Sequence, residues 1–137
     1  MNTLELQGLL LGYPVTVCAS DQIKVRKGQF VFANTDARNG PGKHWVVFYF
    51  PTEGPFEFFD SLGQSPEDYN VNFETVLAKD YWRCFDRLQE DGSDVCGLYC
   101  VYYVKTRCKG LCMKDIVKPF HIHKRTLNDQ YVKHFCT

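Results

Sequence analysis

The sequence lacks any hydrophobic run long enough to cross a membrane, which takes roughly 18–20 consecutive apolar residues. Its longest such run, residues 97–104, is short and is followed by Lys105 and Arg107. The N-terminus has no basic stretch before an apolar segment and no small-residue cleavage site, so a secretory signal is not indicated. We therefore expect a soluble, intracellular, non-secreted protein with no membrane partner.

Internal repeats, low-complexity tracts and linkers rich in proline or serine are also absent from the 137 residues. A chain of this length fits one compact domain with a single core. Aromatic residues make up 15% of it (11 Phe, 8 Tyr and 2 Trp), a share that argues against intrinsic disorder. The sequence thus predicts one folded domain over residues 1–137, and we expect a monomer.

The 16 basic and 16 acidic side chains leave no net charge, but the two signs are segregated along the chain. Residues 1–96 carry 8 basic and 14 acidic side chains, a balance of −6, whereas residues 97–137 carry 8 and 2, a balance of +6. The basic segment predicts either solvated helix faces or a strip that binds nucleic acid. Its members are Lys105, Arg107, Lys109, Lys114, Lys118, Lys124, Arg125 and Lys133.

Seven cysteines occur in a chain without a secretory signal, and an odd number cannot all pair within one chain. Both facts favour free thiols over a disulfide framework, and one thiol can then be reactive. The context described below singles out Cys96, with Cys100 expected to pack beside it. No role is predicted for Cys18, Cys84, Cys108, Cys112 and Cys136.

Strand patterns fill the middle of the chain and helix patterns its two ends. The segment 43–50 follows a dense turn signal at 39–42 and is apolar on both faces, which predicts a buried central strand. A turn at 52–55 leads into 56–60, its expected antiparallel partner. Further strands are expected at 15–18, 29–35 and 81–88, and helices at 3–11, 73–79, 95–107, 114–120 and 126–135. These elements predict an α+β domain with a central mixed or antiparallel sheet.

Cys96 stands where a helix is expected to begin, directly after an acidic loop that contains glycine. Ser93 or Asp94 is the expected N-cap of that helix. A thiolate at a helix N-terminus is stabilised by the partial positive charge there, which lowers the pKa of the thiol. The helix is apolar nearly all round and should lie buried against the sheet. Cys96 is therefore the candidate nucleophile.

His44 leads the expected central strand, and Asp60 ends its expected hairpin partner. Because the start of one hairpin strand lies beside the end of the other, the two side chains should be neighbours. A carboxylate bonded to one ring nitrogen leaves the other nitrogen to take a proton from a thiol. Trp45 can exclude water beside His44, and Gln89, expected at a strand end, can donate its amide to an oxyanion.

The chain resembles the adenovirus-type cysteine proteases (adenain), which share a clan with the Ulp-type proteases of SUMO and other ubiquitin-like proteins. The resemblance covers about residues 33–104 and rests on the segments NTDARNGPGKHWVVFYF, FEFFDSLGQS and LQEDGSDVCGLYC. The clan has His-Trp on a strand, then an acid before Ser-Leu or Phe-Gly, then Gln, then Cys-Gly. Here that order falls on His44 with Trp45, Asp60, Gln89, and Cys96 with Gly97.

This resemblance implies a cysteine endopeptidase in which His44 takes the proton of Cys96 and the thiolate attacks a peptide carbonyl. Asp60 would orient His44, while Gln89 and backbone N–H groups would hold the oxyanion. Trp45 and Gly97 would line a narrow cleft for small residues such as Gly-Gly. The implied partner is a polypeptide substrate, with no metal and no required cofactor.

The chain departs from the adenoviral pattern in three respects. It is shorter, mainly after the helix that carries Cys96. Its acid is Asp60, as in the SUMO-protease branch, where the adenoviral enzymes usually have Glu. The adenoviral enzymes are stimulated by a disulfide-linked viral peptide and by DNA, but Cys84 is not at the spacing of their peptide-linking cysteine. Activation by a viral peptide or DNA is therefore implied by analogy alone.

Several other functions stay open. Within the protease interpretation, maturation of viral precursor proteins, in the cytoplasm or nucleus of a host cell or in the virion, competes with deubiquitinase or deSUMOylase activity. A non-catalytic domain that binds ubiquitin-like tails is disfavoured by the presence of all four catalytic residue types. A zinc-binding module is also disfavoured, because its possible ligands do not have the paired spacing of zinc sites. Those ligands are Cys108, Cys112, His121, His123, His134 and Cys136.

Overall fold

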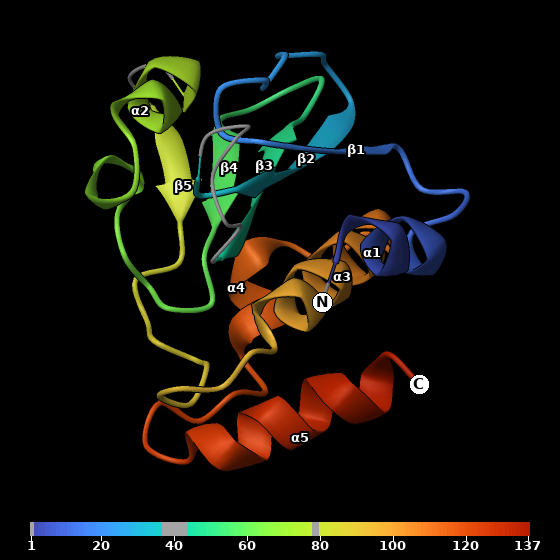
Figure 1. Ribbon diagram of the computed structural model, residues 1–137, viewed down its shortest axis with the longest axis vertical. Coiled ribbons are helices and arrows are strands. Elements are labelled where there is room, and N and C mark those ends of the chain that lie inside the picture. Colours follow the sequence, from blue (N-terminus) through green and yellow to red (C-terminus); the bar gives the residue numbers. More distant parts are fainter. Residues whose placement is uncertain (1, 37–43, 78–79) are drawn as a thin grey trace.

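The computed structural model of the protein describes residues 2–36, 44–77 and 80–137. Within these ranges the middle of the chain forms a sheet and the two ends form helices, which confirms the α+β class (Figure 1). The strands are β1 (Val15–Cys18), β2 (Gln29–Asn34), β3 (Trp45–Phe50), β4 (Phe56–Phe59) and β5 (Tyr81–Arg83). The helices are α1 (Thr3–Leu9), α2 (Val71–Leu77), α3 (Cys96–Cys108), α4 (Met113–Val117) and α5 (Arg125–Phe135), with a 3-10 turn, η1, at Pro66–Asp68.

The five strands form one mixed sheet in the order β1-β2-β3-β4-β5. The outer pairs β1–β2 and β4–β5 are parallel, whereas β2–β3 and β3–β4 are antiparallel. In the β3–β4 hairpin Val47 lies opposite Phe59, and Tyr49 lies opposite Glu57. The start of β3 therefore lies beside the end of β4, as the sequence predicts.

Strand β3 is buried on both faces because each face of the sheet is covered by a helix. Trp45 and Val47 belong to the cluster that contains the residues of α3, whereas Val46 and Phe48 belong to the cluster that contains those of α2. This explains why the strand is apolar without alternation, as is typical of a strand covered on both sides. Burial of each large side chain stabilises the sheet by about 1.5–3 kcal/mol.

Helix α3 is the central helix of the molecule and carries Cys96 as its first residue. It is apolar nearly all round because it packs against β3 on one side and against α1, α4 and α5 on the others (Figure 1). Tyr99, Val101 and Tyr103 are fully buried along its length. Packing on all sides fixes where the helix begins, and therefore where Cys96 lies relative to the sheet.

Two local predictions are wrong. The strand expected at 81–88 ends at Arg83, because the backbone N–H groups of Leu88 and Gln89 donate to the Ser61 carbonyl and not to a neighbouring strand. The expected N-cap residues of α3 do not cap it: the N-cap is Val95, without a side-chain hydrogen bond. The turn at 39–42, Lys43 and the last two residues of the helix expected at 73–79 lie outside the described residues.

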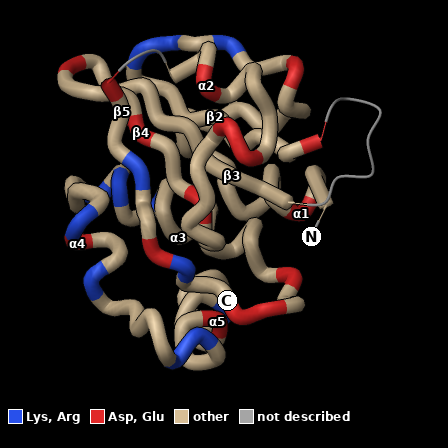
Figure 2. Tube along the Cα trace, turned by 90° about the vertical axis from the view of Figure 1, so that its left-hand side faces the viewer, with Lys and Arg blue, Asp and Glu red and all other residues tan. Residues whose placement is uncertain are grey.

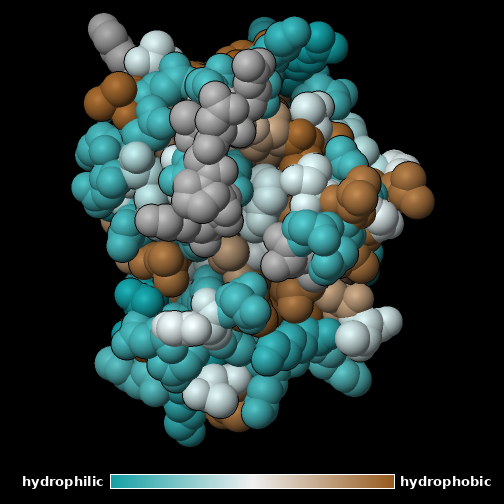
Figure 3. All heavy atoms as spheres, viewed as in Figure 1, coloured by the Kyte–Doolittle hydropathy of each residue, from teal (hydrophilic) through white to brown (hydrophobic). Residues whose placement is uncertain are grey.

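The face of the molecule seen in Figure 3 is mainly hydrophilic, with hydrophobic side chains in small separate patches. The exposed large apolar side chains include Leu4 and Leu11 near α1, and Trp82 and Phe85 around the end of β5. In the part of the chain that the structure describes, no helix is both long enough and apolar enough to span a membrane.

Candidate active site

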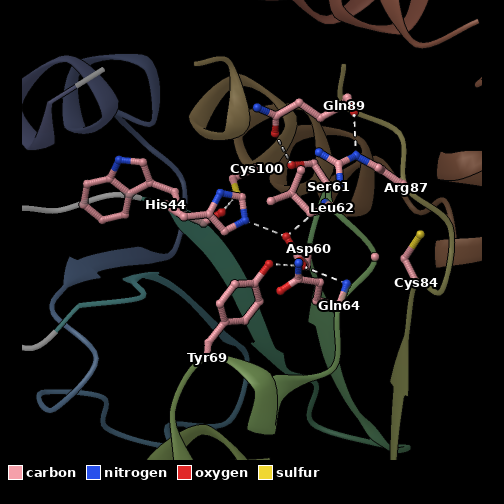
Figure 4. Close-up of polar contacts among 12 residues, drawn as sticks. His44, Asp60, Ser61, Leu62, Gln64, Tyr69, Cys84, Arg87, Gln89 and Cys100 are labelled. Atoms are coloured by element: carbon pink, nitrogen blue, oxygen red, sulfur yellow. Dashed lines mark hydrogen bonds and ion pairs between the residues drawn. The ribbon is translucent and has the colours of Figure 1, made fainter. Parts of the chain in front are cut away.

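The predicted contact between His44 and Asp60 is present in the structure. His44 Nε2 lies 2.6 Å from Asp60 Oδ1, and Figure 4 shows the two side chains pointing toward each other. His44 directly precedes β3 and Asp60 directly follows β4, so the hairpin register brings them together. Asp60 is fully buried and His44 is 8% exposed, so water competes little with this contact.

Cys96 is the second partner of the His44 ring. Its thiol forms a side-chain hydrogen bond with His44, and because Nε2 is bonded to Asp60, Nδ1 is the nitrogen left for the sulfur. Burial alone would lower the pKa of His44, but the hydrogen bonds to Asp60 and Cys96 and their charges raise it to about 9. The imidazole is thus held in its protonated form at neutral pH.

The Cys96 thiol is the counterpart of this protonated ring. Burial alone would raise its pKa, but the hydrogen bond and charge of His44, with N–H groups of Trp45 and Gly97, lower it below the ordinary value. No side chain caps α3, and whereas the N–H groups of Leu98 and Tyr99 donate to the Val95 carbonyl, that of Gly97 is directed to the sulfur. The site therefore favours a thiolate–imidazolium pair.

Five of the other cysteines differ from Cys96 in the direction in which their surroundings shift the thiol pKa. All seven lie in the described ranges and are free thiols. Burial raises the pKa of Cys18 and Cys84 to about 11, with help from Asp21 at Cys18, and raises that of Cys100 well above its ordinary value. Cys108 and Cys136 shift in the same direction. Cys96 is the thiol whose surroundings favour the anion.

The carboxylate of Asp60 is held by the loop that follows it. Backbone N–H groups of Leu62 and Gln64 donate to Oδ1 and Oδ2, each at 3.0 Å, and the Tyr69 hydroxyl donates to Oδ2 at 2.5 Å. Gly63 makes the tight turn with φ of 69°, and an added Cβ would lie 2.7 Å from the Asp86 backbone. These contacts fix the orientation of the carboxylate toward His44.

Tyr69 is not among the site residues that the sequence predicts, because no strand or helix pattern links it to Asp60. The spacing of nine residues from Asp60 carries no known signal. A weak signal does exist, because Ser65-Pro66-Glu67-Asp68 has the pattern of a helix start. It forms η1, where the Ser65 N–H donates to Asp68 Oδ2 at 3.4 Å, and Tyr69 comes directly after it.

Gln89 lies in the loop between β5 and α3 and not at a strand end. Its side-chain oxygen accepts from Ser61 Oγ at 2.7 Å (Figure 4), and its amide nitrogen donates to the Ser93 carbonyl at 2.8 Å. An amide nitrogen carries two N–H groups, so one is left after the bond to Ser93. Ser61 thus sets which way the Gln89 amide faces, and Ser61 itself directly follows Asp60.

Trp45 and Gly97 lie beside the sulfur, but both are buried. Trp45 is 7% exposed and belongs to the same hydrophobic cluster as Cys96. The Trp45 carbonyl accepts from the Cys100 thiol at 3.4 Å, which places Cys100 next to the site as expected. The backbone N–H groups of Trp45 and Gly97 are within reach of the Cys96 sulfur. A role of these two residues in binding substrate stays a prediction.

Helix α5 fixes the loop that carries Gln89. The Asn128 amide donates to the carbonyls of Leu88 and His121, and the Asp129 carboxylate accepts from the Tyr99 hydroxyl at 2.7 Å and from the Glu90 N–H at 3.3 Å. Asn128 and Asp129 are both buried. The end of the chain therefore supports the loop that leads to Cys96.

The zinc-binding alternative finds no support in the structure. Across residues 2–36, 44–77 and 80–137, no three His, Cys, Asp or Glu side chains are grouped so that they could hold a metal ion. Cys112 instead contacts the Asp115 carboxylate at 3.4 Å.

Comparison with known proteins points to the same chemistry. No protein-family profile matches the chain. It is similar to a cysteine protease of African swine fever virus, with 24% identity over 116 residues that cover 76% of this chain and 40% of the viral protein. The chain thus spans well under half the length of this relative. The similarity is distant.

Proposed function

We propose that the protein is a cysteine endopeptidase in which Cys96 is the nucleophile, His44 the general base and acid, and Asp60 the residue that orients His44. The observation that carries this proposal is the line of three side chains. Asp60 lies 2.6 Å from one nitrogen of the His44 ring, and Cys96 is hydrogen-bonded to the same ring. A nucleophile, a base and an orienting group in contact are what covalent catalysis by a thiol requires.

In this mechanism the Cys96 thiolate attacks the scissile carbonyl carbon, and His44 keeps the proton from the thiol. The protonated ring then gives that proton to the leaving amine, and a thioester to Cys96 remains. His44 next takes a proton from water, which attacks the thioester and releases the acid product. Asp60 keeps Nε2 occupied throughout, so that Nδ1 faces the reacting atoms.

The oxyanion of the tetrahedral intermediate would form at the start of α3. Its candidate donors are the backbone N–H groups of Cys96 and Gly97, the first two residues of α3, and the second amide N–H of Gln89. Donors fixed in advance stabilise developing charge without reorganising during the reaction. Ser61 and Ser93 fix the Gln89 amide in this way.

For the substrate we propose a polypeptide cut after small residues of the Gly-Gly type, in the maturation of viral precursor proteins. Trp45 beside His44, and Gly97 beside Cys96, are the residues on which a narrow cleft would be built. The relative named above is itself a viral cysteine protease. The second candidate, removal of ubiquitin or SUMO, rests on Asp60, the acid of the SUMO-protease branch.

The alanine variant of the nucleophile tests the proposed activity. Cys96→Ala removes the sulfur, so turnover of a Gly-Gly-containing peptide should fall to background while the circular dichroism spectrum and the Tm stay near those of the wild type. The matched control is Cys108→Ala, because Cys108 is an exposed thiol on the same helix. Residual turnover by Cys96→Ala, or equal loss in Cys108→Ala, would exclude Cys96 as the nucleophile.

A cleavage-site profile separates the two substrate classes. A peptide library, folded ubiquitin and folded SUMO fusions would be offered to the wild-type protein, with Cys96→Ala as the blank. We expect cleavage of short peptides after small residues and little cleavage of the folded fusions. Faster cleavage of either fusion than of its isolated tail peptide would favour the second candidate.

An activating peptide, implied by analogy, has one feature in its favour and one against it. A groove of about 410 Å³ lies next to Cys84 at the edge strand β5, with Trp82, Phe85 and Met113 among its lining residues. However, Cys84 is 5% exposed, and burial raises the pKa of its thiol to about 11. A thiol in that state is a poor partner for disulfide exchange.

A further inference from the structure

The two oxygens of the Asp60 carboxylate accept from different partners. Oδ1 accepts from His44 and from the Leu62 N–H, whereas Oδ2 accepts from the Gln64 N–H and from the Tyr69 hydroxyl. The 2.5 Å contact with Tyr69 lies at the short end of the range for a hydroxyl on a carboxylate. In Figure 4 the Tyr69 ring lies below the His44 ring, and its hydroxyl points toward Asp60.

Tyr69 is held in place independently of Asp60. Its N–H donates to the Pro66 carbonyl at 3.1 Å as the C-cap of η1. The next residue, Asn70, donates its side-chain amide to Ser20 Oγ at 3.1 Å, which ties the loop to the segment after β1. The Tyr69 ring also lies against the His44 ring, with centroids 5.5 Å apart. The hydroxyl is therefore presented to Asp60 by a fixed backbone.

We propose that Tyr69 is a positioning residue that fixes the Asp60 carboxylate and, by sharing its negative charge, moderates the proton affinity of His44. The kinetic consequence rests on the protease function proposed above, whereas the structural part concerns these three side chains alone. Nothing in the Cys-His-Asp arrangement itself requires a fourth residue, so the inference goes beyond the proposed triad.

The chemistry follows from which group holds the proton. Burial, and then the charge and hydrogen bond of Asp60, raise the pKa of Tyr69 well above its ordinary value, so the hydroxyl stays protonated and remains a donor. A donor on Oδ2 draws negative charge away from Oδ1, and the carboxylate then attracts the His44 proton less strongly. Without it, the charge of Asp60 acts on His44 alone, and the pKa of His44 should rise.

Other ionisable groups face Asp60 and Tyr69. Their effect on the pKa of His44 is the same with and without the substitution Tyr69→Phe. They come from the loop before α3, from α3 itself and from the end of β5, and they are Arg87, Cys96, Cys100 and Cys84. Replacing Cys96 by alanine removes the group among them that is hydrogen-bonded to His44 and acts on it through its charge.

The test is an NMR titration of His44 in the Cys96→Ala chain, with and without Tyr69→Phe. The His44 resonance is identified by its absence in His44→Gln. We expect Tyr69→Phe to raise the pKa of His44 by roughly half a unit or more. Tyr99→Phe is the matched control, since it removes a buried tyrosine–aspartate hydrogen bond of 2.7 Å to Asp129, away from His44, and should leave that pKa unchanged.

Kinetics and a measurement without substitution complete the test. With Cys96 present, Tyr69→Phe should lower kcat by roughly tenfold with little change in KM, because it alters proton transfer and not uniform binding. In the wild-type chain, the Tyr69 hydroxyl proton should give a strongly deshielded resonance that is absent in Tyr69→Phe.

The proposal would be overturned if the pKa of His44 stayed unchanged or fell in Tyr69→Phe. It would also be overturned if a lower Tm were the only change in that variant. The titration needs no turnover. A chain that cleaves no peptide but shows the upward shift would therefore contradict the protease function while keeping the role of Tyr69.

Discussion

Each residue of the proposed triad depends on a neighbour for its chemical state. The thiol of Cys96 is acidified by His44 and by backbone N–H groups, and His44 is kept protonated by Asp60 and Cys96. Asp60 is in turn held by its own loop through Leu62, Gln64 and Tyr69. Substitution of each of these residues should therefore reduce the catalytic activity to a different extent.

Asp60→Asn should lower kcat/KM less than His44→Ala. Asparagine keeps an oxygen that can accept from His44 Nε2, so the ring orientation survives, and Cys96 can still stabilise the protonated ring. His44→Ala removes general acid–base catalysis, a loss of roughly 10²–10⁴-fold. Both variants would be measured on the same peptide near neutral pH. Equal losses in the two variants would mean that Asp60 does more than orient the ring.

The sequence predicted the residues whose positions follow from local geometry. His44 and Asp60 could be paired from the hairpin alone, and Cys96 from the expected helix start. Tyr69 and Ser61 could not be found, because they reach Asp60 and Gln89 through a loop whose path no periodicity encodes. The N-cap expectation was wrong for a related reason: burial of Val95 and Cys96 decides the start of α3, not capping propensity.

At the scale of elements, the position of α3 over the sheet is fixed by a buried polar cluster at its far end. Arg107 on α3 donates to both carboxylate oxygens of Glu57 on β4, at 3.0 to 3.3 Å, and the Tyr103 hydroxyl donates to the same carboxylate. The Glu57 side chain is 4% exposed and that of Arg107 23%. This cluster joins the helix that carries Cys96 to the strand that Asp60 directly follows.

Arg107→Met should therefore destabilise the protein by about 3 kcal/mol, because it leaves the Glu57 carboxylate buried without its cation. Urea unfolding would show the loss as a lower midpoint at unchanged slope. Adding Glu57→Gln should restore part of it, since the uncompensated charge is then gone. Lys118→Met, at an exposed lysine, is the control and should change the stability little. A loss as small as that of the control would mean the pair is not coupled to the fold.

The β3–β4 pairing and the two-sided burial of β3 followed from sequence patterns, whereas β5 was expected to be longer than it is. Its continuation looked like a strand by alternation, yet Leu88 and Gln89 bind the Ser61 carbonyl. That contact joins residues 27 and 28 positions apart, and such tertiary hydrogen bonds override local propensity. The difference matters for function, because Gln89, the candidate oxyanion donor, lies in a loop and not at the end of a strand.

At the scale of the whole molecule, the segregated charge of the sequence becomes a surface feature. Figure 2 shows lysine and arginine positions gathered around α4 and the start of α5. Four of the eight basic side chains contact other groups in the described structure: Arg107 binds Glu57, Arg125 lies 3.9 Å from Asp91, and Lys105 and Lys109 each lie 5.7 Å from the ring centroid of Tyr13 and Phe135 respectively. The remaining lysines are those that could contact a polyanion.

If these lysines bind nucleic acid, the affinity for a short DNA duplex should fall by roughly 100-fold between 50 and 200 mM salt, as about four phosphate contacts would require. Fluorescence anisotropy would measure it. Lys114→Glu with Lys118→Glu should weaken binding, whereas Lys24→Glu, outside the basic segment, should not. Binding that is absent, or unaffected by salt and by the double variant, would leave the basic residues as solvated helix faces.

The central claim is that Cys96 is held as a thiolate by His44, and its alkylation by iodoacetamide against pH tests it most directly. Mass spectrometry would follow each cysteine separately in the wild type and in His44→Ala. We predict that Cys96 reacts faster than the other six cysteines at pH 6, and that the thiolate–imidazolium pair is lost as His44 deprotonates near pH 9. In His44→Ala the reaction at pH 6 should disappear. A Cys96 that reacts only near pH 9, with the same profile in His44→Ala, would contradict the claim.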